Sequence, residues 1–374
     1  MPAVVHVSDG DQWSGGSAQL LALAHGLGAH GWTSRLACRP DSALAREGRK
    51  LGLPVFPAAL RQDYDIFSAL SLARFIVREG ISVIHAHHSR SHGVCLLAKS
   101  FLGWRGPEAQ PTLVVSRRVS FPIGRNPFSH WKYSSPLING YIAVAQAVKD
   151  TLVAGGVEGE RVSVIRSGVD AHAFSPRPPN PGILKELAIP ANRILIGKIA
   201  NASTWKGQRL FLQAAALLTK QGRDLQFLFA GRDTASDELK NEAKRLGLEN
   251  RMRFMGFRND VAEILSCLKV SVNAALQGEG LSGALRESLA MGIPVAASDV
   301  AGNQELFAKA GREFLFSSGS AEALAGRISW ILDHPQDALS LVETWRKQAL
   351  HDFSLEQTIE KTARLYARLC APET

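Results

Sequence analysis

The sequence predicts an α/β protein of two doubly wound domains, each with a parallel sheet between layers of helices. Short apolar runs alternate with helical patterns in both halves of the chain, and a proline-rich stretch separates the two series. The 374 residues are enough for two hydrophobic cores, and the hydrophobic content of 45% is ordinary for a globular protein. We expect the two domains to face each other across a ligand-binding cleft, at the carboxyl ends of their strands.

The first series begins with an apolar run at 4–7, followed by a glycine-containing loop and a helical pattern over 17–29. Further strands are predicted at 32–38, 83–85, 113–115, 142–144 and 162–165. Residues 175–182 contain four prolines, which fit neither a helix interior nor a central strand and therefore predict an interdomain linker.

The second series has strands predicted at 194–199, 226–230, 253–255, 270–273 and 295–297, with helices at 209–218 and 237–245. An amphipathic helix is expected over 355–369. The predicted domains are residues 1–175 and 176–354. Residues 355–374 would pack back on the first domain.

Several classes of protein are excluded by composition. No run of about 18 apolar residues occurs, so no membrane span is predicted. The first residues lack a basic segment followed by an apolar one, so no signal peptide is expected. Cys38, Cys95, Cys267 and Cys370 show no CxxC spacing, which argues against a disulfide framework or a zinc site and favours the cytoplasm.

Positive charge is concentrated in the first half of a chain whose net charge is +9. Within 90–149 the only acidic residue is Glu108, against eight basic residues: Arg90, Lys99, Arg105, Arg117, Arg118, Arg125, Lys132 and Lys149. Such a field favours an anionic partner, whether a phosphorylated glycan, an anionic lipid surface or nucleic acid. A generic solubilising surface is the alternative.

Two carboxylates, Glu279 and Glu287, flank a glycine-containing segment before a predicted helix and buried strand. A strand–loop–helix junction presents backbone N–H groups and a partial positive charge, which suits a phosphate. A carboxylate there would repel phosphate and is better suited to accept hydrogen bonds from hydroxyl groups. A ligand that carries phosphate next to several hydroxyl groups is typically a nucleotide sugar. The segment between the carboxylates that would line this ligand begins with Gly280, Leu281, Ser282 and Gly283.

Other candidate residues also follow predicted strands. Gly15 and Gly16 open the first helix, where the backbone can approach a phosphate closely; an ordinary flexible turn is the alternative. Lys198 closes one strand and Lys206 precedes the next helix, so the two cations could neutralise charge on a departing diphosphate. Without the two glutamates they would be interpreted as surface lysines.

Three histidines, His85, His87 and His88, end another strand. An HxH pattern can ligate a metal, but no third ligand with suitable spacing is visible, so hydrogen bonding to substrate is the favoured interpretation, with a structural role as the alternative. His87 is taken as a catalytic candidate, and His85 and His88 as acceptor-binding candidates. The DxD matches at 9–11 and 63–65 lack supporting ligands for a metal.

Taken together, these elements resemble family 4 of the retaining glycosyltransferases, whose GT-B fold has two facing Rossmann-like domains. The family's E-x7-E pattern matches Glu279 and Glu287, and the Met-Gly-Ile-Pro-Val run at 291–295 agrees downstream. Residues 162–176 resemble the family's interdomain sequence. The elements come in the expected order over nearly the whole chain.

The resemblance implies that residues 1–175 bind the acceptor and that residues 176–354 bind the nucleotide sugar. It also implies a role for each matching residue. Glu279 would accept hydrogen bonds from the donor sugar, and Glu287 would hold the ribose. Lys198 and Lys206 would stabilise the leaving diphosphate, and Gly15 and Gly16 would close on it. Attack would occur on the face from which the leaving group departs, with the leaving phosphate assisting deprotonation, so no protein nucleophile, metal or other cofactor is expected.

Two departures from the family concern the acceptor and the phosphate. Lys198 stands where many members have arginine, so a bidentate phosphate grip is lost. Arg117 and Arg118 follow the 113–115 strand where many members have histidine, which suggests an acceptor that carries phosphate or carboxylate. The aromatic residues Phe121, Phe128, Trp131 and Tyr133 could dock a glycolipid at a membrane face, or form an ordinary packed loop.

The expected function is transfer of a sugar from a nucleotide diphosphate sugar to an anionic glycan or glycolipid, such as lipopolysaccharide core. The enzyme would be cytoplasmic, with peripheral contact to the inner membrane face and no nucleic-acid partner. The alternatives are a nucleotide-sugar epimerase and a non-enzymatic protein that binds anionic surfaces or nucleic acid.

Overall fold

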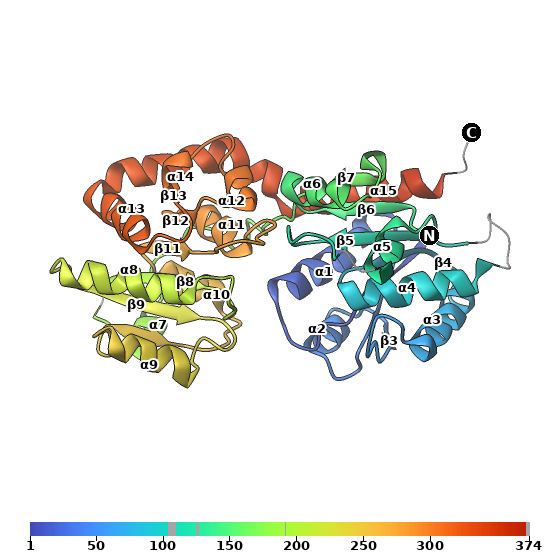
Figure 1. Ribbon diagram of the computed structural model, residues 1–374, viewed down its shortest axis with the longest axis horizontal. Helices are drawn as coiled ribbons and strands as arrows, with labels where there is room; N and C mark the ends of the chain where they lie inside the picture. Colours follow the sequence, from blue (N-terminus) through green and yellow to red (C-terminus); the bar gives the residue numbers. More distant parts are fainter. Residues whose placement is uncertain (104–109, 125–126, 191, 372–374) are drawn as a thin grey trace. The chain divides into compact units, whose positions relative to one another are not determined.

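The computed structural model describes residues 1–103, 110–124, 127–190 and 192–371. The chain forms two compact units (Figure 1). The first comprises Met1–Gly168 together with the C-terminal segment from Leu355, and the second comprises Val169–Ser354. Each unit contains one parallel sheet with helices between its strands, so the predicted α/β class with two Rossmann-like domains is confirmed.

The first unit is built on a seven-stranded parallel sheet in the order β3-β2-β1-β4-β5-β6-β7. Strand β1, inside this sheet, is buried along its whole length, as expected where helices cover both faces of a parallel sheet. The strands are β1 (Ala3–Ser8), β2 (Thr33–Cys38), β3 (Val55–Pro57), β4 (Ile81–Ala86), β5 (Thr112–Arg117), β6 (Gly140–Ala143) and β7 (Val162–Val164). The helices are α1 (Gly15–Gly26), α2 (Ala43–Lys50), α3 (Ile66–Arg78), α4 (Ser89–Phe101), α5 (Pro127–Ser134), α6 (Gln146–Ala154) and α15 (Leu355–Cys370), with short 3₁₀ turns η1 (Leu27–His30) and η4 (Gly159–Arg161).

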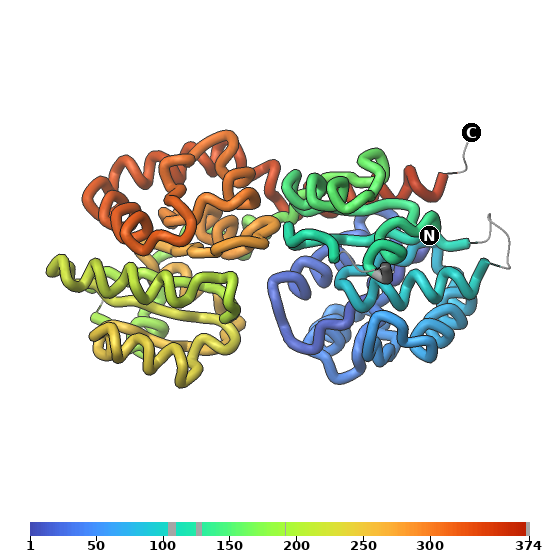
Figure 2. The backbone as a smooth tube through the Cα atoms, in the orientation of Figure 1, coloured from blue at the N-terminus to red at the C-terminus, as the bar shows by residue number. Residues whose placement is uncertain are grey.

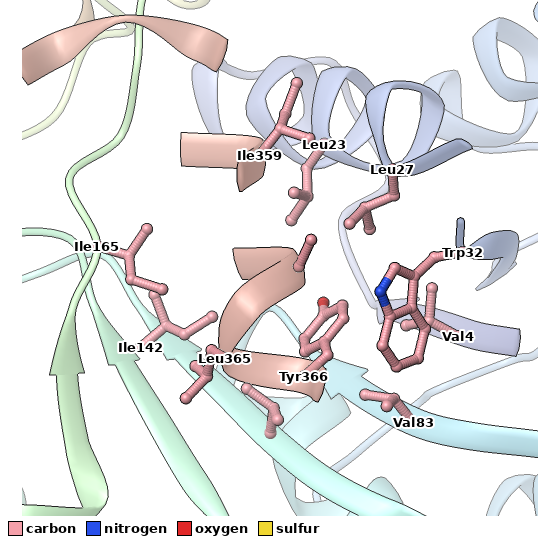
Figure 3. Close-up of a cluster of buried hydrophobic side chains, with 12 residues drawn as sticks. Val4, Leu23, Leu27, Trp32, Val83, Ile142, Ile165, Ile359, Leu365 and Tyr366 are labelled. Carbon is pink, nitrogen blue, oxygen red and sulfur yellow. The ribbon is translucent and has the colours of Figure 1, made fainter. Parts of the chain in front are cut away.

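The C-terminal helix α15 belongs to the first unit although it follows the second in the sequence (Figure 2). Its buried side chains join the core formed by β1, α1, β4 and β6 (Figure 3). Tyr366 packs edge-on against Trp32 with ring centroids 5.2 Å apart, and its hydroxyl lies 2.6 Å from Nδ1 of His85. This helix therefore completes the core of the first unit and contacts a strand that carries predicted site residues.

The second unit has a six-stranded parallel sheet in the order β10-β9-β8-β11-β12-β13. Its strands are β8 (Ile194–Ile199), β9 (Leu225–Ala230), β10 (Met252–Phe254), β11 (Val270–Asn273), β12 (Val295–Ser298) and β13 (Leu315–Phe316). Its helices are α7 (Pro181–Glu186), α8 (Gln208–Lys220), α9 (Asp237–Arg245), α10 (Val261–Ser266), α11 (Gly283–Ala290), α12 (Ala301–Leu306), α13 (Ala321–Asp333) and α14 (Pro335–Ala349), with 3₁₀ turns η5 (Arg312–Phe314) and η6 (Leu350–Phe353).

The proline-rich stretch is part of the second unit, which corrects its expected role as the interdomain linker. Arg177 forms an ion pair with Glu263 of α10 at 2.8 Å, and the backbone N–H of Asn180 donates to Ser266 Oγ at 3.1 Å. Val169 already pairs with Ser354 in a parallel bridge. The unit therefore begins at Val169, and the expected boundary at residue 175 lies inside it.

None of the helices that the structure describes is both long enough and apolar enough to cross a membrane.

Candidate functional site

The second unit brings the predicted lysines and the first glutamate to one edge of its sheet. Lys198 is the last but one residue of β8, and Lys206 lies in the loop before α8. Glu279 lies in the loop between β11, the neighbour of β8, and α11. The carboxyl ends of parallel strands share one edge, where ligands bind in open α/β sheets.

Lys206 and Glu279 contact each other directly. The Nζ of Lys206 lies 2.7 Å from Oε2 of Glu279 and 4.1 Å from the ring centroid of Trp205. The carboxylate is buried, and the ammonium is held between it and the aromatic face. One cation and one hydrogen-bond acceptor for hydroxyl groups therefore lie side by side.

Lys198 is almost fully buried, with 1% of its surface exposed. Burial, with a smaller contribution from the charge of Lys206, lowers the pKa of Lys198 to about 7, while Glu279 opposes the shift. Because a nearby anion favours the charged form of an amine, an incoming diphosphate would raise this pKa and promote protonation. Lys198 can therefore supply positive charge when an anion binds beside it.

The loops that carry Lys206 and Glu279 are fixed by close backbone contacts. Gly207 has φ 71°, and a Cβ there would lie 1.9 Å from the carbonyl oxygen of Ala274. A Cβ on Gly302, in α12, would lie 2.2 Å from the carbonyl oxygen of Gly280. A side chain at either position would displace these loops, so both glycines are required by geometry.

Ser282 is the N-cap of α11 and fixes where this helix begins. Its Oγ accepts hydrogen bonds from the backbone N–H of Leu285 and, at 2.8 Å, from Nδ2 of Asn273. Asn273 ends β11, so the cap ties the helix to its preceding strand. The predicted backbone segment from Gly280 to Gly283 therefore leads into the positive end of a helix.

Glu287 lies on α11 beside Arg286, a buried cation that the sequence reasoning missed. Burial raises the pKa of Glu287, and attraction to Arg286 opposes the rise. Burial lowers the pKa of Arg286 to about 10, against the attraction of Glu287 and Glu279. The sequence shows Arg286 as the basic residue between two acidic ones, Glu279 and Glu287. Helix α11 therefore carries a positive charge that opposes the charge of its own glutamate.

A cavity of about 540 Å³ opens beside the loop that carries Lys206. This volume is in the range of small-molecule sites. Gly207, at its wall, directly follows Lys206 in the sequence. The predicted site residues themselves are not among the described residues that line it, which are Ala202, Ser203, Thr204, Gly207, Gln208, Arg209, Leu210, Asp233, Ser236, Glu238, Leu239 and Leu276.

In the first unit the structure brings Gly16 close to His88 and Arg118. Gly15 and Gly16 begin α1, whose N-cap Ser14 accepts a hydrogen bond from the N–H of Ser17. A Cβ on Gly16 would lie 3.8 Å from both Arg118 Cδ and His88 Nε2. His88 is held by Ser8, whose Oγ lies 3.0 Å from its Nδ1. Residues predicted for donor and acceptor thus meet at the end of β1, β4 and β5.

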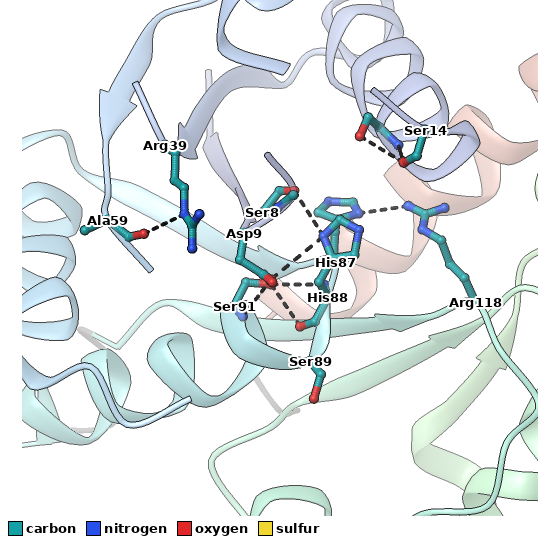
Figure 4. A network of polar contacts seen from close by, with 12 residues as sticks. Ser8, Asp9, Ser14, Arg39, Ala59, His87, His88, Ser89, Ser91 and Arg118 are labelled. Atoms are coloured by element: carbon teal, nitrogen blue, oxygen red, sulfur yellow. Dashed lines mark hydrogen bonds and ion pairs between the residues drawn. The ribbon is translucent and has the colours of Figure 1, made fainter. Parts of the chain in front are cut away.

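Arg118, His87 and His6 form a hydrogen-bond relay (Figure 4 shows its outer part). An Arg118 guanidinium nitrogen lies 3.0 Å from His87 Nδ1, and His87 Nε2 lies 3.0 Å from His6 Nδ1. Because guanidinium can only donate, His87 Nδ1 accepts and the proton of this imidazole is on Nε2, which donates to His6. Both ring nitrogens of His87 are thus engaged, and His87 positions the guanidinium of Arg118. The expected catalytic role of His87 stays a prediction.

His85 is fully buried and bonded at both ring nitrogens. Nδ1 lies 2.6 Å from the Tyr366 hydroxyl and Nε2 lies 2.7 Å from Ser116 Oγ. Both nitrogens therefore bond within the first unit, and the expected acceptor-binding role of His85 stays a prediction. It joins β4 to β5 and to the C-terminal helix.

The third histidine that the HxH pattern lacked is His6, from β1. Ring nitrogens of His6, His85 and His87 all lie within 4.8 Å of one another. Arg118 already donates to His87, and the hydroxyl groups of Tyr366 and Ser116 already bond to the two ring nitrogens of His85. The trio as arranged does not fit a metal ion, which needs several unprotonated nitrogens directed at one point. Burial lowers the pKa of all three imidazoles.

Arg117 is used inside the first unit rather than presented to a ligand. It donates to the Tyr133 hydroxyl at 2.6 Å, to the carbonyl of Val119 at 3.2 Å and to the carbonyl of Phe121. These contacts fix the segment after β5 against α5. The expected acceptor role of Arg117 stays a prediction, and Arg118 is the arginine that lies beside Gly16.

Several other basic side chains of residues 90–149 also bond within the first unit. Lys132 pairs with Asp63 at 2.7 Å, and Lys99 donates to Asn139 Oδ1 at 2.6 Å. Lys149 donates to the carbonyl of Val162 at 3.0 Å. Arg105, Glu108 and Arg125 lie outside the described residues, as does the side chain of Phe128. Arg90 is exposed, and a role of this segment in binding an anionic partner stays a prediction.

Two family models match the chain. One is described as Glycosyl transferases group 1 and matches residues 181–349, and the other is described as Glycosyltransferase Family 4 and matches residues 13–173. Together they cover most of both units. The first contains Lys198, Lys206, Glu279 and Glu287, and the second contains Gly15, Gly16 and Arg118.

Individual relatives match parts of the chain. EpsD of Bacillus subtilis, to which a glycosyltransferase activity is ascribed, is 32% identical over 43% of this chain and 42% of its own length. The UDP-Gal:alpha-D-GlcNAc-diphosphoundecaprenol alpha-1,3-galactosyltransferase of Escherichia coli is 26% identical over 56% of this chain and 55% of its own. The chain thus spans about half the length of these relatives.

A solved structure matches the whole chain. HepE of Anabaena, in a crystal structure with UDP and glucose, has a TM-score of 0.83 at 20% identity, over 98% of this chain and 100% of its own. This likeness shows the fold. The fold is the GT-B fold. The two family models, which together match residues 13–173 and 181–349, show that the chain belongs to family 4 of the glycosyltransferases.

Proposed function

We propose that this protein is a retaining, metal-independent glycosyltransferase that moves a sugar from a nucleotide diphosphate sugar to an anionic glycan or glycolipid. The observation that carries the proposal is the contact of Lys206 with Glu279. Both side chains lie close enough to the buried Lys198 for their charges to act on its pKa. Cations suit a diphosphate and the carboxylate suits the hydroxyl groups of the attached sugar. A site for a plain phosphate would not need the carboxylate.

In the proposed reaction the bond between the anomeric carbon and the diphosphate oxygen breaks. A bond from an acceptor hydroxyl oxygen forms on the same face of the sugar, and the hydroxyl proton passes to the leaving phosphate. Lys198 and Lys206 stabilise the charge that develops on the diphosphate. Glu279 orients the sugar and Glu287 holds the ribose. This route requires neither a protein nucleophile nor a metal.

The acceptor half of the proposal rests on Arg118. Its guanidinium is fixed by His87 and lies beside Gly16 at the start of α1. An arginine in this place suits a phosphate or carboxylate on the acceptor. The name of the Escherichia coli relative describes an acceptor linked through diphosphate to undecaprenol, which is an anionic glycolipid. We therefore favour a bacterial envelope acceptor of this class, or lipopolysaccharide core, used at the cytoplasmic face of the membrane.

A ligand screen tests the donor half first. UDP-, GDP- and ADP-sugars are compared for their effect on the melting temperature, since a ligand that binds the native state stabilises it by mass action. One nucleotide series is expected to raise the melting temperature of the wild type and to have a smaller effect on Glu279→Gln. An equal rise in both proteins would remove Glu279 from the donor site.

A turnover assay then separates the proposed transferase from its rivals. With the selected donor and lipid-linked acceptors, the product should keep the anomeric configuration of the donor, and chelation of divalent cations should leave the rate unchanged. A new nucleotide sugar formed without acceptor would identify an epimerase. Binding of anionic ligands with no donor turnover would identify a non-enzymatic binding protein. Inversion at the anomeric carbon would contradict the proposed mechanism.

A further inference from the structure

The outer face of α3 exposes a group of large apolar side chains. Phe67 is 87% exposed, which is unusual for a phenylalanine in a protein with a well-formed core. It has apolar neighbours along the same helix and in the turn before it. The exposed fractions of these neighbours are Tyr64 59%, Ile66 54%, Leu70 37% and Val77 42%.

These residues lie on one side of the helix by their spacing. Positions three and four apart share a helix face, which places Phe67, Leu70 and Arg74 together. The opposite face is buried through Leu72 and Ile76, and α3 packs against α4. The helix therefore already has a core-facing side, and the exposed apolar side is an additional one.

Positive charge surrounds this apolar face. Arg61 precedes the helix, and Arg74 and Arg78 lie along it, all exposed to solvent. The acidic residues nearby are used within the first unit. Asp63 pairs with Lys132 at 2.7 Å, and Asp65 caps α3 by accepting from the N–H of Ser68. Glu79 pairs with Arg35 and Arg78.

We propose that the outer face of α3 docks on an anionic lipid bilayer surface. Phe67, Ile66 and Leu70 would enter the boundary between headgroups and acyl chains, while Arg61 and Arg74 contact lipid phosphates. This is the composition of a helix that lies in a membrane interface: aromatic and aliphatic side chains flanked by arginine. An apolar face without the arginines would suit a protein partner equally well, and the charge favours the membrane.

The surface differs from the one that the sequence indicated. The basic residues Lys99 and Lys132, and the arginine at 117, are committed to contacts inside the first unit. Trp131 is 42% exposed and lies on α5 next to Lys132, the partner of Asp63. The proposed docking face is therefore centred on α3. It depends on exposed side chains and not on the proposed activity.

Vesicle binding tests the proposal. The full-length protein is sedimented with vesicles of phosphatidylcholine that contain phosphatidylglycerol, and with vesicles of phosphatidylcholine alone. Binding is expected to the anionic vesicles and to fall with added salt. Phe67→Ser and Arg74→Glu should each weaken the binding roughly tenfold, because one removes the main apolar contact and the other reverses a charge near the lipid phosphates.

Matched controls lie in the second unit. Leu339→Ser removes an exposed leucine of α14, and Lys240→Glu reverses an exposed charge of α9; neither should change vesicle binding. Melting temperatures should be equal in all variants, since the altered side chains are exposed. Donor hydrolysis is measured in parallel, so that loss of vesicle binding is distinguished from failure of the proposed enzyme function.

Three results would overturn the proposal. One is the absence of wild-type binding to anionic vesicles, and another is unchanged binding in both α3 variants. The third is a wild-type dimer that Phe67→Ser converts to a monomer while vesicle binding stays absent, which would make this face a contact between copies of the chain.

Discussion

Lys206 and Glu279 neutralise each other at the edge of the second sheet, with 2.7 Å between Nζ and Oε2. In the proposed reaction they have separate tasks, one toward the diphosphate and one toward the sugar. Donor binding must therefore share or exchange this contact. The pair compensates the buried carboxylate of Glu279, and in the proposed reaction the hydroxyl groups of the sugar would take the place of Lys206.

Replacing Glu279 with glutamine should abolish or nearly abolish transfer while the protein still folds. The amide of glutamine keeps the shape of the side chain. It loses the charge that holds Lys206, and it also loses the second oxygen that could accept hydrogen bonds from sugar hydroxyl groups. We expect kcat to fall by about 10²–10³, as for loss of one charge-stabilising group in an active site. Steady-state kinetics with donor and acceptor measures the change, and circular dichroism checks the fold.

An exposed carboxylate provides the control for this substitution. Asp333 on α13 pairs with Arg223 at 2.6 Å at the surface of the same unit. Asp333→Asn removes a surface ion pair, which contributes about 0–1 kcal/mol, and should leave kcat unchanged. If Glu279→Gln and Asp333→Asn had similar turnover, the site assignment would fail.

Donor affinity should depend on pH through Lys198. Its pKa is lowered to about 7, chiefly by burial, and a bound diphosphate would raise it. Below pH 7 the ammonium is already present, so affinity should be constant there. As pH rises above 7, binding must recruit a proton, and affinity should fall by up to about tenfold per pH unit. A nucleotide sugar is the suitable probe, because its diphosphate does not titrate in this range.

Arginine at position 198 should remove this dependence. Its guanidinium stays charged, so the affinity of Lys198→Arg for the nucleotide sugar should remain constant from pH 6 to pH 9. Titration calorimetry of both proteins over this range measures the difference. Parallel pH profiles for the two proteins would show that another group governs donor binding.

The fold could be largely predicted because buried parallel strands are continuous apolar runs. β1 and β8 are of this kind, and both were recognised. The missed strands are short edge strands: β3 is partly exposed and contains Pro57, and β13 has two residues. The proline-rich stretch was taken for a linker, since its packing on α10 depends on Arg177 and Glu263, which are far apart in sequence.

The clustering of Lys198, Lys206 and Glu279 at one edge of the sheet was predictable, because strand ends determine it. Partners between distant segments were not predictable. His6 reaches His87 because β1 pairs with β4, and Tyr366 reaches His85 because α15 returns to the first unit. Arg117 and Arg118 are adjacent in the sequence yet have different partners. No local sequence pattern distinguishes a side chain that bonds within the protein from one that is available to a ligand.

The two adjacent arginines should therefore give different results on truncation. Arg118→Ala removes the proposed contact to an anionic acceptor and should raise the acceptor KM roughly 10- to 100-fold, the loss expected for a charge-assisted hydrogen bond. Arg117→Ala removes the bonds to Tyr133 and Val119 and should lower the free energy of unfolding by about 1–3 kcal/mol.

Kinetics and urea denaturation of both variants separate the two roles. Donor hydrolysis without acceptor should change less than transfer in Arg118→Ala, because the proposed contacts of Lys198, Lys206 and Glu279 with the donor come from the second unit. Arg117→Ala should keep its acceptor KM when rates are expressed per folded molecule. An acceptor KM that rises in Arg117→Ala alone would reverse the assignment.

His6 should make the protein sensitive to acid. Burial, with the charge of Arg118 adding, lowers the pKa of His6 to about 3, whereas its ordinary value is 6.5. Between these values the unfolded chain binds a proton that the folded chain does not. Stability from this group is therefore complete above pH 6.5 and is lost as pH falls toward 3. Between pH 7 and pH 5 the contribution of His6 should amount to about 1–2 kcal/mol.

Two substitutions at position 6 separate this acid effect from the positioning of Arg118. In both His6→Gln and His6→Leu, stability should fall less between pH 7 and pH 5 than in the wild type, as measured by urea denaturation. Glutamine can still accept the proton of His87 Nε2, so its acceptor KM should stay near the wild-type value. Leucine leaves that buried N–H without an acceptor, which should lower stability by about 1–3 kcal/mol at pH 7 and raise the acceptor KM. Equal acceptor KM values for the two variants would show that the relay does not position Arg118, whatever its effect on stability.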